Sequence, residues 1–365
     1  MNRHILAVFF VLAGLMGLRP LQSCAQSSDA AFRHAQPGYQ WSFPKDHSFH
    51  EGFQTEWWYY TGHLWSAGSE PFRDAPLYGF QLTFFRRQGD PGNKASDEFL
   101  AHAALTDLHS GETKFSSRKG GALLGVAGAS PEALEVWSGD WLAELVGKTH
   151  VLRFSTGPTA SQQVRLLGTV ESSPWLQGDR GFSKKGACDT CASHYYSVAR
   201  IPLSGEVRRG NGVTAVTGIG WMDHEFMSNA LAPDQVGWDW MGLMLRDGRS
   251  LTVFRLRKQD GSSSFVSANI LTNGRAESIP SEQITLTPTN YWTSSDSKGR
   301  YPLSWRVEIP GKGIDVVVNA RTQRCEIGGG ASELEPRYWE GPVASTDESV
   351  LGYLEMTGYA EKVRL

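Results

Sequence analysis

The sequence lacks the features that mark several large classes of protein. Lysine and arginine total 35 against 38 aspartates and glutamates, so no basic excess predicts a nucleic-acid partner. Charged residues make up 20% and hydrophobic residues 40% of the chain, which excludes a disordered protein or a coiled coil. Only four cysteines occur in 365 residues, so the core must form by packing, and this length predicts about two domains.

Motifs for nucleophilic catalysis and nucleotide binding are also missing. The chain has no Gly-x-Ser-x-Gly elbow, no Gly-x-x-x-x-Gly-Lys-Ser/Thr loop and no dinucleotide fingerprint that opens a helix. His102, Asp107 and His109 are spaced neither as His-x-x-x-His nor as one face of a helix. We therefore expect neither a cofactor nor a metal ion.

Long hydrophobic runs are confined to the N-terminus, where residues 5–18 are almost wholly apolar. This run is too short to span a bilayer comfortably and is typical of a secretory signal peptide, predicted here over residues 1–25. Two processing routes remain open. Ser23-Cys24-Ala25 offers a cleavage site before Gln26, whereas residues 21–24 resemble a bacterial lipobox that would leave Cys24 lipidated. We expect an exported protein, either periplasmic or an outer-membrane lipoprotein tethered through Cys24.

Export changes how the remaining cysteines are interpreted. Cys188 and Cys191 form a Cys-x-x-Cys pair, and an oxidising compartment favours a local disulfide between them. Free thiols and a metal or redox role are the alternatives. His194 lies nearby, but nothing in the neighbouring sequence completes a zinc site.

Most of the chain has the pattern of strands. Alternating or apolar stretches rich in β-branched and aromatic residues recur at short intervals, separated by Asp-Gly, Asn-Gly and Pro-Gly turn signals. Residues 130–145 fit either a capped helix or a hairpin around Ser138–Asp140, and Gly139 favours the hairpin. The pattern predicts an all-β fold. The expected strands lie at 56–63, 78–86, 151–155, 193–201, 213–226, 238–245, 251–257, 303–309, 314–320 and 350–359.

A polar segment at 228–237, which contains Pro233, is the best candidate for a linker. It predicts an N-terminal domain over 41–228 and a C-terminal domain over 229–365. Nothing in the sequence indicates the oligomeric state.

Several sequence blocks together resemble one family. The blocks are TEWWYYTGHL (55–64), YGFQLTFFR (78–86), AHAALTD (101–107), QGDRGFSKKG (177–186), HYYSVARI (194–201), GIGWMDHEF (218–226), GWDWMGLML (237–245), YWEGPV (338–343) and GYLEMTGY (352–359). Over nearly its whole mature length the chain is similar to AttH-type lipocalin-like proteins, often labelled secreted hydrolases and related to carotenoid 1,2-hydratases. The resemblance implies two tandem lipocalin-like antiparallel β-barrel domains. It also implies kinship with hydratases and cyclising enzymes that act on apolar polyene or polyketide substrates.

Asp223 is the leading candidate for a catalytic residue. In a strand over 220–226, Trp221, Asp223 and Glu225 share one face and His224 points to the other. A carboxyl beside tryptophan in an apolar pocket has a raised pKa and can donate a proton near neutrality. The resemblance implies the same role, because carotenoid hydratases use an aspartate in an aromatic-x-Asp motif. Glu225 and His224 would support it. Alternatively, Asp223 and Glu225 pair with arginine or backbone at a strand end.

Aromatic residues beside acids and histidines are candidates for binding the substrate, with a structural role as the alternative for each. Protonation of a double bond creates a carbocation, which aromatic faces stabilise by cation–π attraction. The candidates are Trp221, Glu56, Trp58, Tyr60, His194, Tyr196, Trp238 and Trp240.

Two functions are therefore open. The first is an exported enzyme that performs acid-assisted hydration, hydrolysis or isomerisation on an apolar, isoprenoid or polyketide-like small molecule. The second is a non-catalytic binding or carrier protein for an apolar ligand in the cell envelope. A buried carboxyl with a raised pKa that faces the ligand would favour the enzyme.

Overall fold

The structure is a computed structural model that describes residues 31–91, 93–228, 231–329 and 335–363. The predicted signal peptide and Cys24 lie outside these ranges. The described residues form strands and short 3-10 turns but no α-helix, which confirms the all-β prediction. None of their helical segments has the length and apolar character needed to cross a membrane. The 3-10 turns are η1 Lys45–His47, η2 Lys94–Ser96, η3 Ala122–Leu124, η4 Pro158–Ala160, η5 Ser281–Gln283 and η6 Pro310–Lys312.

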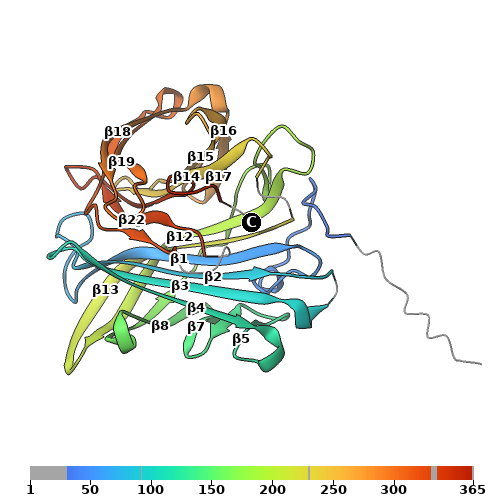
Figure 1. Cartoon of the computed structure of the whole chain (residues 1–365). Coiled ribbons are helices and arrows are strands. Elements are labelled where there is room, and N and C mark those ends of the chain that lie inside the picture. Colours follow the sequence, from blue (N-terminus) through green and yellow to red (C-terminus); the bar gives the residue numbers. More distant parts are fainter. Residues whose placement is uncertain (1–30, 92, 229–230, 330–334, 364–365) are drawn as a thin grey trace, which may run out of the picture. The chain divides into compact units, whose positions relative to one another are not determined.

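The first sheet is antiparallel and curls until its edge strands β4 and β5 approach each other (Figure 1). Its described strands follow the spatial order β4-β3-β2-β1-β13-β12-β9-β8-β7-β6-β5, and β10 and β11 also pair with β12. The strands are β1 Thr55–Ser66, β2 Tyr78–Arg87, β3 Glu98–Asp107, β4 Glu112–Gly121, β5 Ala127–Ala129, β6 Glu135–Ser138, β7 Trp141–Val146, β8 Thr149–Thr156, β9 Gln162–Thr169, β10 Trp175–Leu176, β11 Phe182–Lys184, β12 Ala192–Arg209 and β13 Gly212–Met227.

The second sheet is also antiparallel and curled, with the order β17-β16-β15-β14-β23-β22-β20-β19-β18 and with β21 beside β22. Two curled antiparallel sheets confirm the prediction of tandem barrel-like units. Its described strands are β14 Gln235–Leu245, β15 Ser250–Lys258, β16 Ser263–Thr272, β17 Arg275–Ile279, β18 Thr285–Thr293, β19 Arg300–Ile309, β20 Ile314–Ala320, β21 Glu326–Ile327, β22 Tyr338–Ala344 and β23 Val350–Met356.

Local sequence signals explain several boundaries. The predicted hairpin forms between β6 and β7, and Gly139 takes the positive φ of 61° that its turn requires. The stretch expected at 350–359 is a strand only as far as Met356, because the chain then turns at Gly358, where φ is 73°. The chain passes from the first sheet to the second between Met227 and Gln235, within the segment predicted as a linker.

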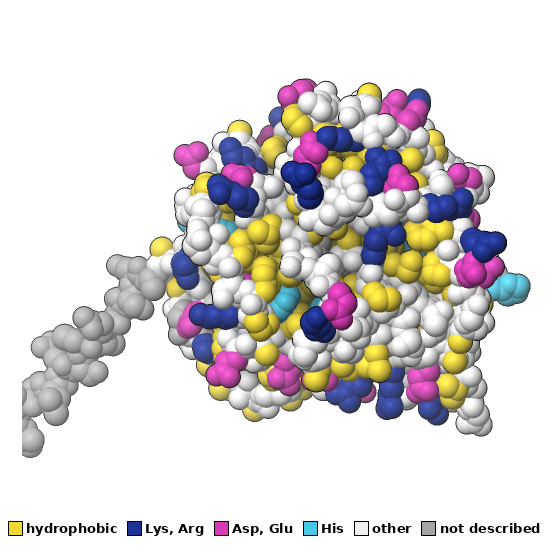
Figure 2. All heavy atoms as spheres, turned by 180° about the vertical axis from the view of Figure 1, so that it is seen from behind, with side chains coloured by type: hydrophobic (Ala, Val, Ile, Leu, Met, Phe, Trp, Pro, Cys, Tyr) yellow, Lys and Arg dark blue, Asp and Glu magenta, His cyan; other side chains and the backbone are white. Residues whose placement is uncertain are grey.

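Burial along the strands shows which surfaces meet. In β9 buried and exposed residues alternate strictly, as expected for a strand with one face in solvent. In β1 and β14 nearly every residue is buried, because one face packs into its own sheet's core and the other packs against the opposite sheet. On the face shown in Figure 2, hydrophobic side chains gather at hollows, and basic and acidic side chains lie interspersed.

Three large apolar clusters and one small cluster around Trp65 fill the described part of the molecule. One, which includes Trp58, Tyr60 and Phe80, fills the interior of the first sheet, and another around Trp305 and Trp339 fills the second. The third lies between the sheets and contains Trp221 and Trp240. The interiors of the curled sheets are thus packed by side chains, and the aromatic layer between the sheets is where the candidate site lies.

Candidate functional site

A cavity of about 780 Å³, counted as all space between atoms including its mouth, lies between the two sheets. Its walls are β1, β2, β12 and β13 of the first sheet and β14, β15, β22 and β23 of the second. Most of the lining is apolar, and its aromatic members include Trp57, Tyr59, Phe85, Trp238, Trp240 and Phe254.

Asp223 projects into this cavity from β13. Its side chain is buried and has no arginine or lysine partner among the described residues. Three donors hold it instead: the Ser197 hydroxyl at 2.5 Å and the Trp221 indole at 2.7 Å donate to Oδ1, and the Tyr195 hydroxyl at 2.6 Å donates to Oδ2. Asp223 therefore faces the cavity and is not neutralised at a strand end.

Further donors fix the direction of these hydrogen bonds. The Gln177 amide donates to the Ser197 hydroxyl at 2.7 Å, and the Trp240 indole donates to the Tyr195 hydroxyl at 3.1 Å. Each hydroxyl therefore has its own proton free for Asp223. Burial raises the pKa of Asp223 to about 7, although the three hydrogen bonds favour the charged carboxylate and oppose the shift. Such a carboxyl can exchange a proton near neutrality.

Glu225 lies on the same face but is a different kind of acid. The Lys185 ammonium is 2.7 Å from its Oε1, and the Ser193 hydroxyl donates to the same oxygen at 2.5 Å. Lys185 also lies 4.3 Å from the ring centroid of Phe254, within cation–π range. Glu225 is therefore one half of a buried ion pair at the cavity wall.

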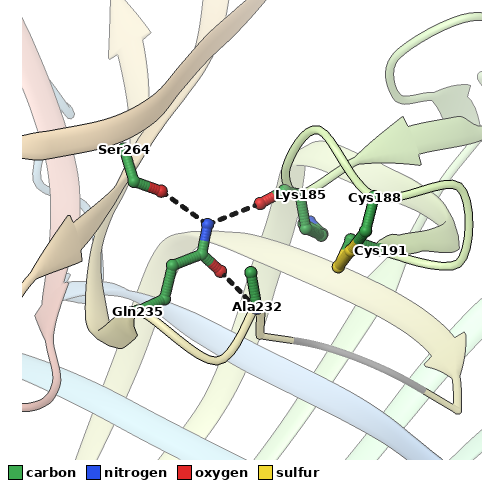
Figure 3. The surroundings of a disulfide bond; sticks show 6 residues. All are labelled: Lys185, Cys188, Cys191, Ala232, Gln235 and Ser264. Atoms are coloured by element: carbon green, nitrogen blue, oxygen red, sulfur yellow. Dashed lines mark hydrogen bonds between the residues drawn. A yellow bond between two sulfur atoms is a disulfide. The ribbon is translucent and has the colours of Figure 1, made fainter.

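The loop that carries Lys185 is closed by a disulfide between Cys188 and Cys191. Figure 3 shows the Gln235 side chain beside it, donating to the Lys185 carbonyl at 2.9 Å and to the Ser264 hydroxyl at 2.6 Å. The Lys185 backbone N–H also donates to the Cys191 carbonyl at 2.8 Å. These contacts fix the backbone of Lys185 against β14 and β16.

Two further acids line the opposite wall, and the sequence analysis missed both. Glu340 on β22 and Glu355 on β23 are directly paired across their strands. Burial, with help from the charges of Asp223 and Glu225, raises the pKa of Glu355 to about 7 against a hydrogen bond from the Trp238 indole. Burial and the charge of Glu355 raise the pKa of Glu340 well above its usual range.

The cavity thus joins residues that are far apart in sequence. The block YWEGPV carries Glu340 and GYLEMTGY carries Glu355, each an acid within a strongly aromatic stretch. That pattern could have marked them as candidates, but only the register of β22 and β23 places them side by side. Tyr195 and Lys185 were missed for the same reason.

The predicted site residues fall on two opposite faces of the first sheet. Four of them line the cavity: Asp223, Glu225, Trp238 and Trp240. Trp221 does not line it but donates a hydrogen bond to Asp223, which does. The other predicted residues belong to the interior face or to the end of the first sheet. These are Glu56, Trp58, Tyr60, His194, Tyr196 and His224.

The residues on the interior face form their own hydrogen-bond network. His224 Nε2 is 2.8 Å from Glu56 Oε1, and its Nδ1 is 2.9 Å from the Tyr196 hydroxyl. Hydrogen bonds from His224 and His50 lower the pKa of Glu56 although burial opposes them. His224 is thus directed away from Asp223. The sequence predicted that His224 supports Asp223, but both of its ring nitrogens lie against Tyr196 and Glu56 instead.

Comparisons with known proteins agree with this architecture. The model of the AttH-like family matches residues 34–359. A crystal structure from Nitrosomonas europaea that carries the provisional description AttH has a TM-score of 0.80 and 29% sequence identity, covering 91% of this chain and all of that chain. No curated protein matches this chain.

Two more distant structures share the fold. Kievitone hydratase from Nectria haematococca has a TM-score of 0.62 at 13% identity, covering 90% of this chain and 96% of its own. CghA, solved with Sch210972, has a TM-score of 0.50 at 11% identity, covering 85% of this chain and 90% of its own. The match of the family model over nearly all the described residues shows that the chain belongs to the AttH-like family.

Proposed function

We propose that this protein is an enzyme that adds water to a carbon–carbon double bond of an apolar substrate, or removes it, with Asp223 as the general acid. The observation that carries the proposal is the environment of Asp223. It is a buried carboxyl without a cationic partner, its pKa is about 7, and it lies in the wall of an aromatic cavity. Perturbed carboxyls of this kind cluster at catalytic sites.

The protonation step uses the neutral form of Asp223. Its carboxyl proton passes to one alkene carbon, and the electrons of the double bond form the new C–H bond. The neighbouring carbon becomes a cation. Trp57, Trp238 and Trp240 line the cavity in which this charge develops, and aromatic faces stabilise cations within about 6 Å of a ring centroid.

The second step needs an acceptor for the proton of the attacking water. Glu355 lies on the opposite wall, and its raised pKa of about 7 suits it to this role. Water oxygen bonds to the carbocation, and its proton passes to the Glu355 carboxylate. The product is an alcohol, and the proton returns from Glu355 to Asp223 through solvent, so one water is added overall.

The cavity wall also suggests the kind of substrate. The Tyr59 and Tyr338 hydroxyls lie near the Glu340 carboxyl and favour its charged form, but Oε1 makes no hydrogen bond of ordinary length among the described residues. A water molecule or a polar group of a ligand is therefore expected to complete its hydrogen bonding. The remaining wall is largely aromatic. A mainly apolar molecule with a few oxygen atoms, of isoprenoid or polyketide type, matches this combination. The name of kievitone hydratase, a distant structural neighbour, agrees with hydration.

The test is conversion of defined substrates in H₂¹⁸O by wild type and Asp223→Asn. An acyclic carotenoid and kievitone would be the first two compounds. We expect a product heavier by about 20 Da with wild type, and a rate at least about 100-fold lower with Asp223→Asn, as for loss of a general acid. Asp260→Asn, in an exposed turn, is the matched control. Conversion by Asp223→Asn at the wild-type rate would refute the role of Asp223.

A carrier function is the second candidate, and the aromatic wall of the cavity favours it because such a wall binds apolar ligands without chemistry. Native mass spectrometry of protein from its host separates the two. An apolar ligand retained unaltered by wild type and Asp223→Asn alike would identify a carrier. A ligand altered in mass by wild type alone would identify an enzyme.

We also propose that the protein is exported, on the strength of the apolar N-terminal run at residues 5–18. The mass of the mature N-terminus in the native host decides between the two processing routes. A chain that begins at Gln26 indicates a soluble periplasmic protein, and a diacylglyceryl Cys24 indicates a lipoprotein.

A further inference from the structure

A second cluster of titratable side chains lies on the face of β1 and β13 that points away from the cavity. His50 precedes β1, Glu56 is on β1 and His224 is on β13. His50 Nδ1 and His224 Nε2 are each 2.8 Å from Glu56 Oε1, and the three atoms lie within 4.8 Å of one another. Two imidazoles and one carboxylate therefore converge on one point.

The second nitrogen of each imidazole is already held. His50 Nε2 lies 3.4 Å from Asp46 Oδ1, and His224 Nδ1 lies 2.9 Å from the Tyr196 hydroxyl. The remaining Glu56 oxygen, Oε2, accepts the His50 backbone N–H at 2.9 Å. Groups that orient histidines through the far ring nitrogen are the usual outer shell of a protein metal site.

Packing fixes the rings as well. The His50 ring stacks on Phe226 with centroids 3.6 Å apart and planes 9° apart, and the His224 ring stacks on Trp58 at 4.8 Å. Glu56 and His224 are fully buried, whereas the His50 side chain is 10% exposed. Glu56 and His224 are thus fixed on neighbouring strands, and His50, in the segment before β1, is held by ring stacking and lies nearest to solvent.

The charge of the cluster leaves room for a cation. Asp46, Glu56 and Asp97 supply three carboxylates, and Arg86 supplies one positive charge, 2.7 Å from Asp97 and 3.5 Å from Glu56. A cation held between the imidazoles would add positive charge beside these carboxylates, in a setting where unpaired charge is costly.

We propose that His50, Glu56 and His224 form a binding site for a divalent transition-metal ion of the zinc type. Two nitrogens and one carboxylate oxygen are a ligand set that zinc accepts, with bonds of about 2.0–2.2 Å. Tetrahedral ligands at that distance lie about 3.3 Å apart. Each imidazole nitrogen would therefore move about 0.5 Å away from Oε1, and the two nitrogens, which lie within 4.8 Å of each other, would have to reach the same spacing. His224 then carries its proton on Nδ1 and donates it to the Tyr196 oxygen.

The site has a structural consequence that is separate from the proposed chemistry. The segment before β1 already contacts the first sheet, for example through His47 and the Tyr196 hydroxyl, and the metal would add a further tie from His50 to β1 and β13. The three ligands face away from the cavity that Asp223 lines. A protein without hydratase activity could therefore still bind the metal, and a protein that binds no metal could still use Asp223 as its acid.

The test uses the full mature chain without a histidine tag, dialysed against EDTA and then into metal-free buffer. Zn²⁺ is titrated by calorimetry, and Co²⁺ is used as a visible spectroscopic probe. We expect one equivalent of tightly bound metal. His50→Gln should weaken binding by more than about 100-fold, and Asp46→Asn by about 10–100-fold, as for outer-shell partners. His109→Gln, an exposed histidine, should bind as wild type.

Two results of the titrations would overturn the proposal, and a third would come from spectroscopy. One is no stoichiometric binding of Zn²⁺ by the wild type, which would identify a purely hydrogen-bonded network. The other is wild-type affinity in His50→Gln. Zinc-edge X-ray absorption of the wild type needs no variant to fold, and it should show two imidazoles and one carboxylate at about 2.0 Å. A spectrum without imidazole ligands would equally refute the site.

Discussion

Glu340 and Glu355 are directly paired across β22 and β23 with both carboxyls at the cavity wall. Like charges opposite each other on neighbouring strands destabilise a sheet. The pair is tolerated because burial raises the pKa of both acids, so that protons, not counter-ions, relieve the repulsion. The second sheet thus presents neutral acids to the cavity under mildly acidic conditions.

This pairing predicts that the protein loses stability as the pH rises. An acid whose pKa is higher in the folded state than in the unfolded state binds more protons when the protein is folded. Its contribution to the free energy of unfolding is fully present below the unfolded-state pKa, and it is lost as the pH rises through the folded-state pKa. For Glu355 the window runs from its ordinary 4.5 to about 7. We expect the free energy of unfolding of the wild type to fall by about 1–3 kcal/mol between pH 5 and pH 8 from this group.

Glu355→Gln should show a smaller fall over the same range, measured by urea unfolding at both pH values. Glu132→Gln, at an exposed position, is the control and should follow the wild type. Parallel pH dependence in wild type and Glu355→Gln would show that Glu355 ionises normally.

Tyr195 is expected to set the pH at which Asp223 loses its proton. Its hydroxyl donates to Oδ2 and so favours the carboxylate. A hydrogen bond to a charged group contributes about 1.5–3 kcal/mol, so Tyr195→Phe should raise the pKa of Asp223 by about one to two pH units above its value of about 7.

Infrared titration of the protonated carboxyl band, with Asp223→Asn subtracted, measures this pKa directly. Any activity that depends on the protonated acid should persist to correspondingly higher pH in Tyr195→Phe. Tyr291→Phe, at a side chain that is 44% exposed, should leave the titration unchanged. A pKa that falls in Tyr195→Phe would contradict the hydrogen-bond assignment.

The disulfide should stabilise the protein only modestly. Cys188 and Cys191 are three residues apart, and closing so short a loop constrains the unfolded chain by about 2 kcal/mol. We therefore expect the Cys188→Ser, Cys191→Ser double variant to lose about that much stability and to exchange amide hydrogens faster over 185–191. Dithiothreitol should reproduce the loss in wild type and have no effect on the variant.

The sequence predicted one wall of the cavity because strand periodicity is a local property. A period of two places Asp223 and Glu225 on the face opposite His224, and the structure has the same arrangement. Aromatics on both faces of 55–64 likewise indicated a strand covered on both sides, and β1 is buried along nearly its whole length. The same alternation predicted that Asp223 is buried beside Trp221, and both side chains are buried.

The two acids of the opposite wall were not predictable in this way, although Trp238 and Trp240 on the same wall were among the candidates. Glu340 and Glu355 line the same cavity as Asp223 only because β22 and β23 of the second sheet contact β2 and β1 of the first, a relationship that no local pattern encodes. His50 lies in an irregular segment without periodicity, so its approach to Glu56 and His224 depends on where that segment crosses the end of the first sheet. Contacts between distant segments are the information that composition and spacing lack.

The ion pair of Lys185 and Glu225 gives the sharpest test of the cavity's electrostatics. Both side chains are at most 10% exposed, and removing one partner of a buried pair leaves an uncompensated charge at a cost of about 3–5 kcal/mol. Lys185→Met should therefore be strongly destabilising, whereas the Lys185→Met, Glu225→Gln double variant should recover much of the loss. Lys148→Met, which breaks the exposed pair with Glu171, should cost at most about 1 kcal/mol. A double-mutant cycle by urea unfolding measures the coupling, and additive losses at positions 185 and 225 would mean that the two charges do not interact.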